Sequence, residues 1–279
     1  MGSDCGVSDL AALTKANYLC NELGLDTISM GSAIACAMEL VEKGFLPVAE
    51  IGRRLAWGDG DAVVSLVRQT AYREGFGDIL AEGSLRLASR YGHPELAMVC
   101  KGMDFAGYDP RGVSHMRGDT EYCELLGVPH PVDPHSWEDK SEMVAKWRNI
   151  FSIIDAAGLC VFITVRYLVE PTLNLRPTGI MELLNAATGA NYTLEELEIA
   201  GERIFNAERL FIINRAGFDR KQNSLPPRMT AEPMPAGPSK GKVCHLEEML
   251  DAYYRFRGWT PNGIPTAEKL AKLSLAQIG

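Results

Sequence analysis

The stretch IFSIIDAAGLCVFITV, residues 150–165, decides how this sequence should fold. It is the only long apolar run in the chain, and it contains a single carboxylate, Asp155, followed by Gly158 and Cys160. The run is too short and too polar for a membrane span, so we interpret it as a buried helix. Burying a carboxylate without hydrogen-bond donors costs on the order of several kcal/mol. We therefore expect Asp155 either to be satisfied by nearby amides or to face a group that supplies donors.

Helical periodicity continues on both sides of this run. The expected helices cover residues 8–23, 31–42, 61–74, 78–91, 141–158, 178–188, 193–212, 246–257 and 266–273. Gly24 and Gly189 follow two of them as stop signals, and Thr193 with Glu196 forms a capping box. We find no convincing alternation with period two and no internal repeat. The predicted fold class is all-α and multihelical.

Two stretches lack a helical period. Residues 102–140 contain recurring Gly, Pro, His and Asp, and long irregular stretches of this kind tend to be functional. Residues 217–243 are rich in proline and poor in apolar residues, which predicts an extended surface arm. We expect two helical lobes divided near residue 95. Residues 1–95 would form the first lobe, and residues 96–279 would form the second lobe with its C-terminal arm.

Composition excludes several classes of protein. The chain of 279 residues is 46% hydrophobic and 23% charged, which is typical of a globular protein. A net charge of −8 without a Lys/Arg run argues against nucleic acid and anionic membrane surfaces as partners. The seven cysteines are scattered, without a C-x-x-C pair, and no signal peptide is evident, so we expect a reducing cytoplasm. Walker A, G-x-G-x-x-G, G-x-S-x-G and H-E-x-x-H motifs are absent.

Two short segments share one pattern. NELGLDT, residues 21–27, and DAAGLCV, residues 155–161, both read Asx-x-x-Gly-Leu-(Asp/Cys)-x near the end of an expected helix. Gly24 and Gly158 can adopt positive φ and let the backbone approach a ligand closely. The amides after each glycine, together with Asp26, could bind the polar edge of a heterocycle. The alternative is that both segments are ordinary glycine helix caps.

This pair of segments resembles the two pterin-binding motifs of the tungsten-containing aldehyde ferredoxin oxidoreductase family. Further stretches that resemble the family are ANYLCNELGLDTISMGSAIACAMELVEKG (16–44), YDPRG (108–112), FNAERLFIINRAGFDRKQNSLPPR (205–228) and YYRFRGWTPNGIPTAEKL (253–270). The similarity extends over the chain from about residue 8. It implies the multihelical C-terminal part of such an enzyme, domains 2 and 3, whose two lobes enclose a metal bound by two pterin dithiolenes.

The resemblance also implies site residues. In the first motif Asn21, Leu25 and Asp26 would contact one pterin, with Asn21 standing where the family usually has Asp. In the second motif Asp155, Leu159, Cys160 and Val161 would contact the other pterin, and Cys160 would also be a thiolate ligand of a [4Fe–4S] cluster.

A further set of site residues lies in the irregular stretch. His115 matches the family's active-site histidine, whose role would be hydrogen bonding or proton transfer at the substrate carbonyl. Ser114, Arg117 and Gly118 flank it at the pterin edge, where Arg117 could place a cation between pterin and cluster. The spacing between the DPRG sequence and His115 is much shorter here than in typical members of the family.

The chain departs from the family in one important respect. A four-iron cluster needs four thiolates, and the family supplies three from an upstream C-x-x-C-x-x-x-C run that this sequence lacks. We therefore expect the C-terminal portion of a tungsten (or molybdenum) bis-pterin and [4Fe–4S] enzyme that oxidises aldehydes with ferredoxin. This chain alone should bind no cofactor and be inactive without an N-terminal domain or subunit, and a homodimer is compatible with the sequence. The alternative is a non-catalytic helical module that binds a partner domain.

Overall fold

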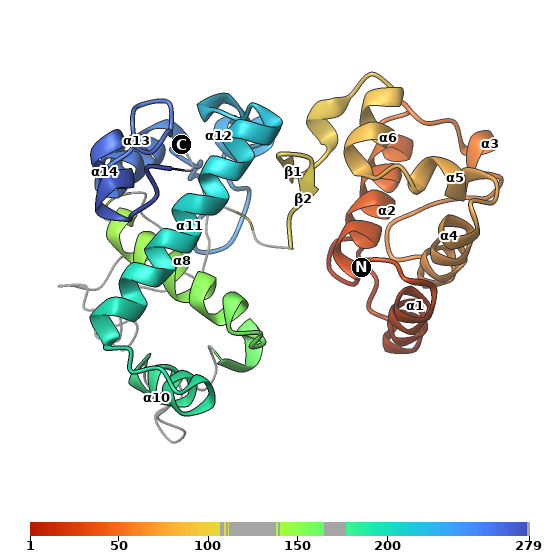
Figure 1. Ribbon diagram of the computed structural model, residues 1–279. Coiled ribbons are helices and arrows are strands. Elements are labelled where there is room, and N and C mark those ends of the chain that lie inside the picture. Colours follow the sequence, from red (N-terminus) through yellow and green to blue (C-terminus); the bar gives the residue numbers. More distant parts are fainter. Residues whose placement is uncertain (107–108, 110, 112–137, 139, 165–176, 278–279) are drawn as a thin grey trace. The chain divides into compact units, whose positions relative to one another are not determined.

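Helices form most of the structure in Figure 1, a computed structural model that describes residues 1–106, 109, 111, 138, 140–164 and 177–277. The α-helices are α1 (Leu10–Leu23), α2 (Thr27–Glu42), α3 (Val48–Ile51), α4 (Gly60–Tyr72), α5 (Phe76–Leu80), α6 (Ser84–Arg90), α8 (Ser141–Ala156), α10 (Pro177–Thr188), α11 (Leu194–Ala216), α12 (Pro227–Ala231), α13 (Leu246–Arg257) and α14 (Ala267–Lys272). Within the described residues the strands are β1 (Val99–Cys100) and β2 (Met103–Asp104), which pair antiparallel. The all-α, multihelical prediction is confirmed.

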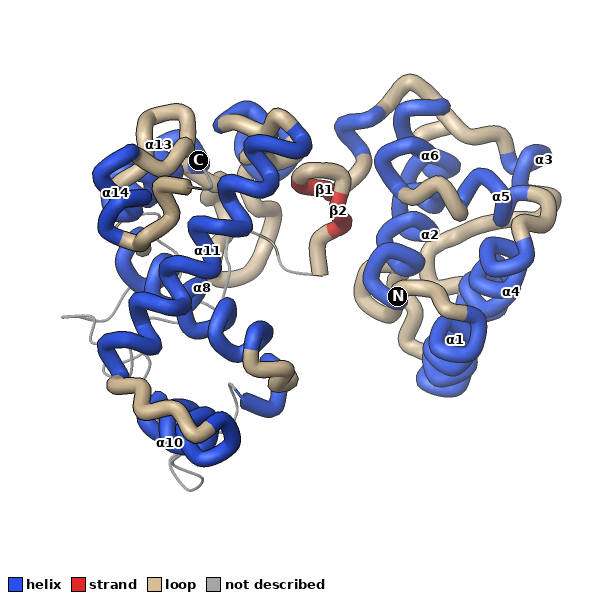
Figure 2. Tube along the Cα trace, in the orientation of Figure 1, coloured by secondary structure: helices blue, strands red, loops and turns tan. Residues whose placement is uncertain are grey.

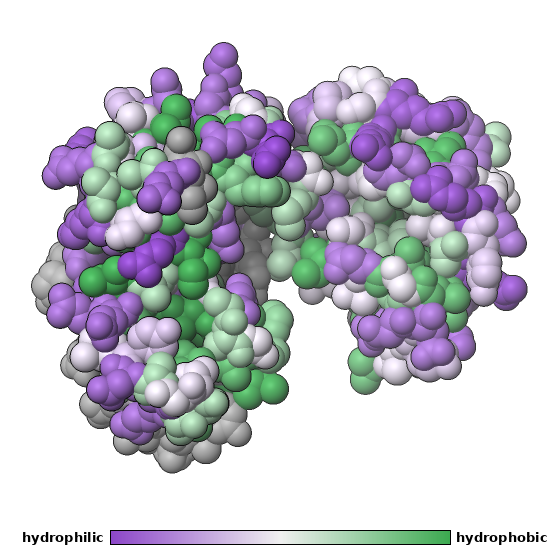
Figure 3. Space-filling model, in the orientation of Figure 1, coloured by the Kyte–Doolittle hydropathy of each residue, from purple (hydrophilic) through white to green (hydrophobic). Residues whose placement is uncertain are grey.

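The chain divides into two compact units. Unit 1 consists of Met1–Arg111 and Asn223–Val243, and unit 2 consists of Gly112–Gln222 and Cys244–Gly279. Figure 2 shows that both are built of helices joined by loops, and hydrophilic side chains cover much of the face drawn in Figure 3. Unit 1 extends past the boundary expected near residue 95, because it includes the β1–β2 pair and also a segment of the proline-rich stretch.

The core of unit 1 surrounds α2. Small and apolar side chains of this helix are buried on several of its sides, among them those of Ala33, Ile34, Ala37 and Met38. The side chains of α4, α5 and α6 complete the same apolar cluster. A continuous cluster of this kind explains why α2 contains several alanines, since small side chains allow neighbouring elements to approach closely.

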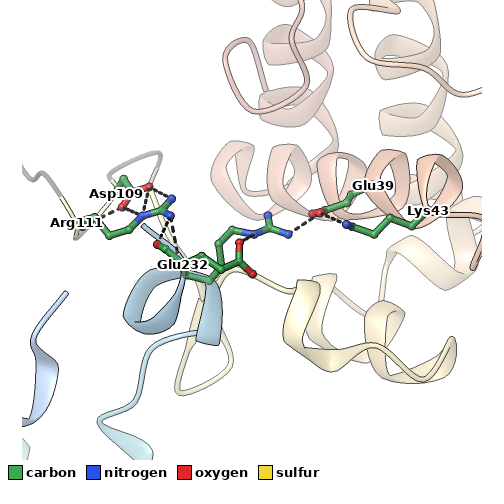
Figure 4. A network of polar contacts seen from close by, with 6 residues as sticks. Glu39, Lys43, Asp109, Arg111 and Glu232 are labelled. Carbon is green, nitrogen blue, oxygen red and sulfur yellow. Dashed lines mark hydrogen bonds and ion pairs between the residues drawn. The ribbon is translucent and has the colours of Figure 1, made fainter. Parts of the chain in front are cut away.

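After leaving unit 1 at Arg111, the chain returns to it with residues 223–243. An ionic network connects this returning segment to the rest of unit 1 (Figure 4). The Arg111 guanidinium forms a fork with the Asp109 carboxylate, with an Nη2–Oδ2 distance of 2.6 Å. Its Nη1 also donates to the backbone carbonyls of Arg228, at 3.2 Å, and Glu232, at 2.9 Å. Arg228 in turn pairs with Glu39 of α2. Arg111 thus binds the backbone of residues 228 and 232, and Arg228 joins the same segment to α2.

The core of unit 2 is the packing of α8 against α11. Ile153 and Ile154 of α8 form a buried cluster with Ile180 of α10 and Leu197 of α11. Farther along the same pair of helices, Gly201 lies so close to α8 that an added Cβ would meet a backbone carbonyl. The apolar run at residues 150–165 is therefore a buried helix only in its first part: α8 ends at Ala156, the chain turns at Gly158, and Leu159, Phe162 and Ile163 are exposed.

Polar contacts connect the two C-terminal stretches that resemble the family. The Trp259 indole N–H donates to Asn206 Oδ1 at 2.8 Å, and Arg209 Nε donates to the Gly263 carbonyl at 2.9 Å. Arg220 pairs with both Glu247 and Asp251. These bonds join α11 and the segment after it to α13 and the following loop, so these residues support the fold of unit 2.

Three local expectations need correction. Residues 78–91 do not form one helix, because Gly83 at φ 86° separates α5 from α6. The helix expected at residues 31–42 begins earlier, since Asp26 caps it and Thr27 is its first residue. The proline-rich stretch contains the short helix α12. None of the described helices combines the length and apolar character that crossing a membrane requires.

Candidate functional site

The first motif forms a sharp turn between α1 and α2. Gly24 ends α1 in the left-handed conformation, with φ 72° and ψ 34°. The Leu25 amide donates to the Cys20 carbonyl at 2.8 Å, a bond that closes the helix end. Asp26 then begins the next helix, and its carbonyl accepts from the Met30 amide at 3.0 Å. The chain therefore passes from one helix to another within three residues.

The second motif follows the same path at the end of α8. Gly158 has φ 71°, and the Leu159 amide donates to the Ile154 carbonyl at 3.0 Å. The carbonyl of Cys160 accepts from the Thr164 amide at 2.9 Å, which starts a helical turn over residues 161–164. Both motifs thus have a left-handed glycine, an amide that closes the preceding helix, and a following residue that opens another helix.

The two glycines leave open space above the backbone. A Cβ placed on either Gly24 or Gly158 would have no heavy atom within 4 Å outside its own chain neighbours. Glycine is needed at both positions because positive φ is unfavourable for other residues. A planar ligand could therefore lie close to the backbone at either turn.

The polar side chains of the first turn are already bonded to the protein. Asn21 donates from Nδ2 to the Asn17 carbonyl at 3.0 Å. Asp26 accepts from the Ser29 amide at 2.7 Å as the N-cap of α2, and this hydrogen bond lowers the pKa of its carboxyl. Leu25 is half-buried and packs against the core of unit 1.

The corresponding side chains of the second turn are not bonded. Asp155 and Cys160 are exposed, and neither side chain has a hydrogen bond or ion pair to any described residue. Because Asp155 is exposed, it pays no burial penalty, and the sequence-based expectation that it needs nearby donors does not apply to the described structure. The turn therefore presents a carboxylate and a thiol that have no partner among the described residues.

A second carboxylate lies near the first turn. Asp104 of β2 accepts a hydrogen bond from the Ser84 hydroxyl. Burial raises the pKa of Asp104, the negative charge of Asp26 raises it further, and hydrogen bonds from Ser84 and Ser29 oppose the shift. Sequence analysis missed this residue because nothing in the pattern connects Asp104 to a motif far upstream.

Apolar side chains surround the second turn. Phe162 is 82% exposed and Ile163 is 59% exposed, and Leu159 beside them is also exposed. Figure 3 shows hydrophobic surface gathered over the carboxyl end of α8 and the turn after it. Val161, by contrast, packs against the buried cluster of α8, α10 and α11. This surface is more apolar than an ordinary helix end in water.

The remaining expected site residues are Ser114, His115, Arg117 and Gly118, and all four lie outside the described residues. Across the described ranges, no group of three or more His, Cys, Asp and Glu side chains is placed to bind a metal ion. Cys160 is therefore a single potential thiolate ligand rather than part of a complete site in this portion of the chain.

Similarity to known proteins agrees with the paired turns. Residues 1–275 match the family described as aldehyde ferredoxin oxidoreductase, domains 2 & 3. The chain belongs to the aldehyde ferredoxin oxidoreductase family. It is 42% identical to the tungsten-containing aldehyde ferredoxin oxidoreductase of Pyrococcus furiosus and 41% identical to that of Thermococcus kodakarensis. Both alignments cover 100% of this chain and 47% of the relative, so the chain spans about half the length of these enzymes.

Two further proteins are similar to this chain. The chain is 30% identical to the WOR-like subunit of an aliphatic sulfonate oxidoreductase from Pyrococcus furiosus, over 99% of this chain and 45% of that one. The BamBC active-site complex of benzoyl coenzyme A reductase is similar in structure, with a TM-score of 0.58 at 22% identity. That match covers 91% of this chain and 45% of the other, and it shows that the fold is shared.

Proposed function

We propose that this member of the aldehyde ferredoxin oxidoreductase family is the cofactor-enclosing C-terminal portion of an enzyme that oxidises aldehydes to carboxylic acids. The observation that carries the proposal is the second turn, where the side chains of Asp155 and Cys160 are exposed and have no partner among the described residues, beside the open backbone of Gly158. Two relatives that align with the whole of this chain bear names that state tungsten and aldehyde. The reaction joins an aldehyde and water to give a carboxylic acid, two protons and two electrons, and ferredoxin accepts the electrons.

The residues of both turns fit a bis-pterin cofactor. Asn21, Leu25 and Asp26 would bind one pterin, and Asp155, Leu159, Cys160 and Val161 would bind the other. When bound, the tungsten or molybdenum centre would supply the two-electron oxidation and a [4Fe–4S] cluster would conduct the electrons. The exposed Cys160 thiol is suited to be one cluster ligand, and the open space at both glycines lets a heterocycle approach the amides.

The protein would also manage protons and water. His115 would hold or transfer a proton at the substrate carbonyl, with Ser114, Arg117 and Gly118 beside it at the pterin edge. The exposed apolar side chains Phe162 and Ile163 would exclude water from the bound cofactor once the rest of the site covers them. The remaining cluster ligands would come from a domain or subunit beyond these 279 residues. The proposed enzyme would work in a reducing cytoplasm. Two copies of it would associate as a homodimer.

Metal content tests this function. The chain would be purified anaerobically from cells grown with tungstate, with and without the preceding domain of a family member, and tungsten, molybdenum and iron would be measured by mass spectrometry. We expect metal and aldehyde-dependent viologen reduction in the completed protein, and neither in the isolated chain. Robust turnover by the isolated chain would contradict the expected division of the site, and a metal-free, inactive completed protein would contradict the function.

A second candidate function is favoured by the exposed apolar surface at residues 159–163. Surface of this kind is typical of protein–protein contacts, so the chain could be a non-catalytic module that binds a partner domain. The two functions differ in one measurement. A module would bind its partner domain stably without acquiring tungsten or iron.

A further inference from the structure

A tight hairpin brings Asp104 to the beginning of α2, next to the first turn. Lys101 at φ 54° and Gly102 at φ 79° connect β1 to β2, and Val99 pairs with Asp104. Two consecutive residues at positive φ are typical of the compact turns that join neighbouring strands. Successive side chains of a strand point to opposite faces, and Met103 is accordingly 75% exposed while Asp104 is half-buried. The hairpin therefore turns the Asp104 carboxyl towards the rest of unit 1.

Asp104 belongs to a line of hydrogen bonds that leads to Asp26. The Ser84 hydroxyl of α6 donates to Asp104 Oδ1. The Ser29 side chain of α2 hydrogen-bonds to the carboxyls of both Asp104 and Asp26, and the Ser29 amide donates to Asp26 Oδ2 at 2.7 Å. Exposure falls along this line, from the exposed Asp26 through half-buried Ser29 and Asp104 to the buried Ser84. Ser29 thus connects a carboxylate that a ligand can reach with one that is less accessible.

The Ser29 hydroxyl can donate to only one of the two carboxyls at a time. A hydroxyl has one O–H donor and two acceptor lone pairs. An ionised Asp104 competes with Asp26 for the Ser29 proton. A protonated Asp104 can instead donate its own proton to Ser29 Oγ, which leaves the Ser29 proton for Asp26. The ionisation of Asp104 therefore changes how much of the Asp26 carboxylate remains open to a ligand.

The other ionisable groups of α2 on this side are neutral or paired. Burial raises the pKa of the Cys36 thiol to about 12, and the negative charges of Glu39 and Asp104 raise it as well. Cys36 therefore stays neutral at the pH values at which carboxyls titrate. Glu39 is paired with Arg228, so its charge is balanced. The charge beside the first turn thus changes at Asp26 and Asp104.

We propose that Asp104 is a positioning residue for the first turn, and that it controls, through the Ser29 hydroxyl, how freely Asp26 accepts the N–H donors of a bound pterin. This inference rests on the proposed function, because it takes a pterin as the ligand of Asp26. Hydrogen bonds from N–H groups to an ionised carboxylate are stronger than bonds between neutral groups. An ionised Asp104 draws the Ser29 proton and adds negative charge that attracts the same donors. Protonation of Asp104 reverses both effects, so the turn should hold a pterin less tightly in acid.

NMR titration of isotope-labelled aspartate carboxyls in the isolated chain tests the link between the two acids without a cofactor. Asp26→Asn removes the neighbouring charge, so the Asp104 carboxyl should titrate at a lower pH than in the wild type. Ser29→Ala removes a hydrogen bond to the ionised form, so the same carboxyl should titrate at a higher pH. Asp61→Asn, which changes an exposed carboxylate of unit 1, is the matched control and should leave this titration unchanged. An Asp104 titration that is the same in the wild type and all variants would overturn the link.

Tungsten retention by the completed protein tests the consequence for the cofactor. Asp104→Asn should retain several-fold less tungsten than the wild type after dialysis at neutral pH, because Ser29 then competes for Asp26. Acidification should release tungsten from the wild type and change retention by Asp104→Asn little. Asp104→Glu restores a carboxyl and should recover part of the retention together with its pH dependence, whereas Asp61→Asn should match the wild type.

The two possible failures are distinguishable. Retention by Asp104→Asn that equals the retention by a tungsten-loaded wild type at every pH would overturn this inference alone. A completed wild type that contains no tungsten would overturn the proposed function, and this inference with it.

Discussion

The turns at Gly24 and Gly158 follow one backbone path and differ in what their polar side chains do. At the first turn, Asp26 caps α2 and Leu25 packs into the core. At the second, Cys160 replaces the aspartate, and Leu159 faces solvent. The polar side chains of the first turn therefore bond to their own unit, whereas the Asp155 carboxylate and the Cys160 thiol have no partner in the part of unit 2 that is described. The two turns thus share a backbone path but differ in whether their polar side chains bond to described residues of their own unit.

The largest expected difference concerns iron. Cys160→Ala in the completed enzyme should reduce bound iron to less than about a tenth of the normal content, because an iron–sulfur cluster is held by cysteine thiolates. The exposed thiol has no partner in the described chain, so the unfolding midpoint of the isolated chain should stay the same. Mass spectrometry of iron and urea unfolding provide the two measurements. Cys100→Ala serves as the control. Full iron retention in Cys160→Ala would mean that the second turn does not differ from the first by supplying a ligand to the cluster.

The glycines should behave alike. Gly24→Val and Gly158→Val should each lower the free energy of unfolding by about 1–2 kcal/mol, because a branched side chain is strained at positive φ. Hydrogen exchange with mass spectrometry would measure local opening in α1 and α8 separately. Gly24→Asn and Gly158→Asn are the matched controls, since asparagine tolerates this conformation better. Clearly unequal costs for the two valine variants would show that the turns are not equivalent.

Much of this comparison was predictable from local sequence. The Asx-x-x-Gly-Leu pattern predicted two helix ends with positive φ at Gly24 and Gly158, and the capping box at Thr193 and Glu196 is present. Such features depend on residues within one or two turns of each other, where propensity and capping chemistry dominate.

The rest depends on contacts between distant segments. Asp104 lies near Asp26 only because β2 packs close to α2, and Arg228 reaches Glu39 only because the chain returns to unit 1. The same return explains why a single division near residue 95 does not describe the compact units. The roles of Asn21, Asp155 and His115 at a cofactor stay predictions, and His115 lies outside the described residues.

The aspartates of the two turns should differ in their effect on stability. Asp26→Ala should lower the free energy of unfolding by about 1 kcal/mol, the usual effect of losing an N-cap side chain. Asp155→Ala should change it by less than about 0.5 kcal/mol, because the carboxylate is exposed and unbonded. Urea unfolding followed by circular dichroism compares the two variants directly. A loss in Asp155→Ala as large as that in Asp26→Ala would mean that the second turn also depends on its carboxylate for folding.

The smallest expected effect is a dependence of folding stability on pH, which comes from two carboxyls at and near the first turn, those of Asp26 and Asp104. The pKa of Asp26 is lowered, so its stabilisation is complete above the ordinary carboxyl pKa of about 4 and is lost as pH falls through the lowered value. The pKa of Asp104 is raised, so its contribution is complete at low pH and is lost as pH rises through the raised value. Urea midpoints between pH 6 and pH 3 should therefore rise first and then fall.

Two variants with an amide in place of the carboxyl show which residue causes the rise in the urea midpoint and which causes the fall. Asp104→Asn should remove the rise, and Asp26→Asn should remove the fall, because asparagine still caps a helix but does not titrate. Wild-type midpoints that decline steadily across the whole range would contradict the opposite signs assigned to the two carboxyls.

The return of residues 223–243 to unit 1 has a consequence for biosynthesis. Glu39 and Arg111 emerge from the ribosome long before Arg228, their partner in the ionic network. Translation proceeds at roughly 5–20 residues per second, so residues 223–243 are synthesised on the order of ten seconds after the first segment of unit 1. During that interval most of unit 2 is synthesised, so the last step in forming unit 1 falls after much of unit 2 has had time to fold. Chaperones should therefore bind nascent chains shorter than about 230 residues more than they bind longer ones.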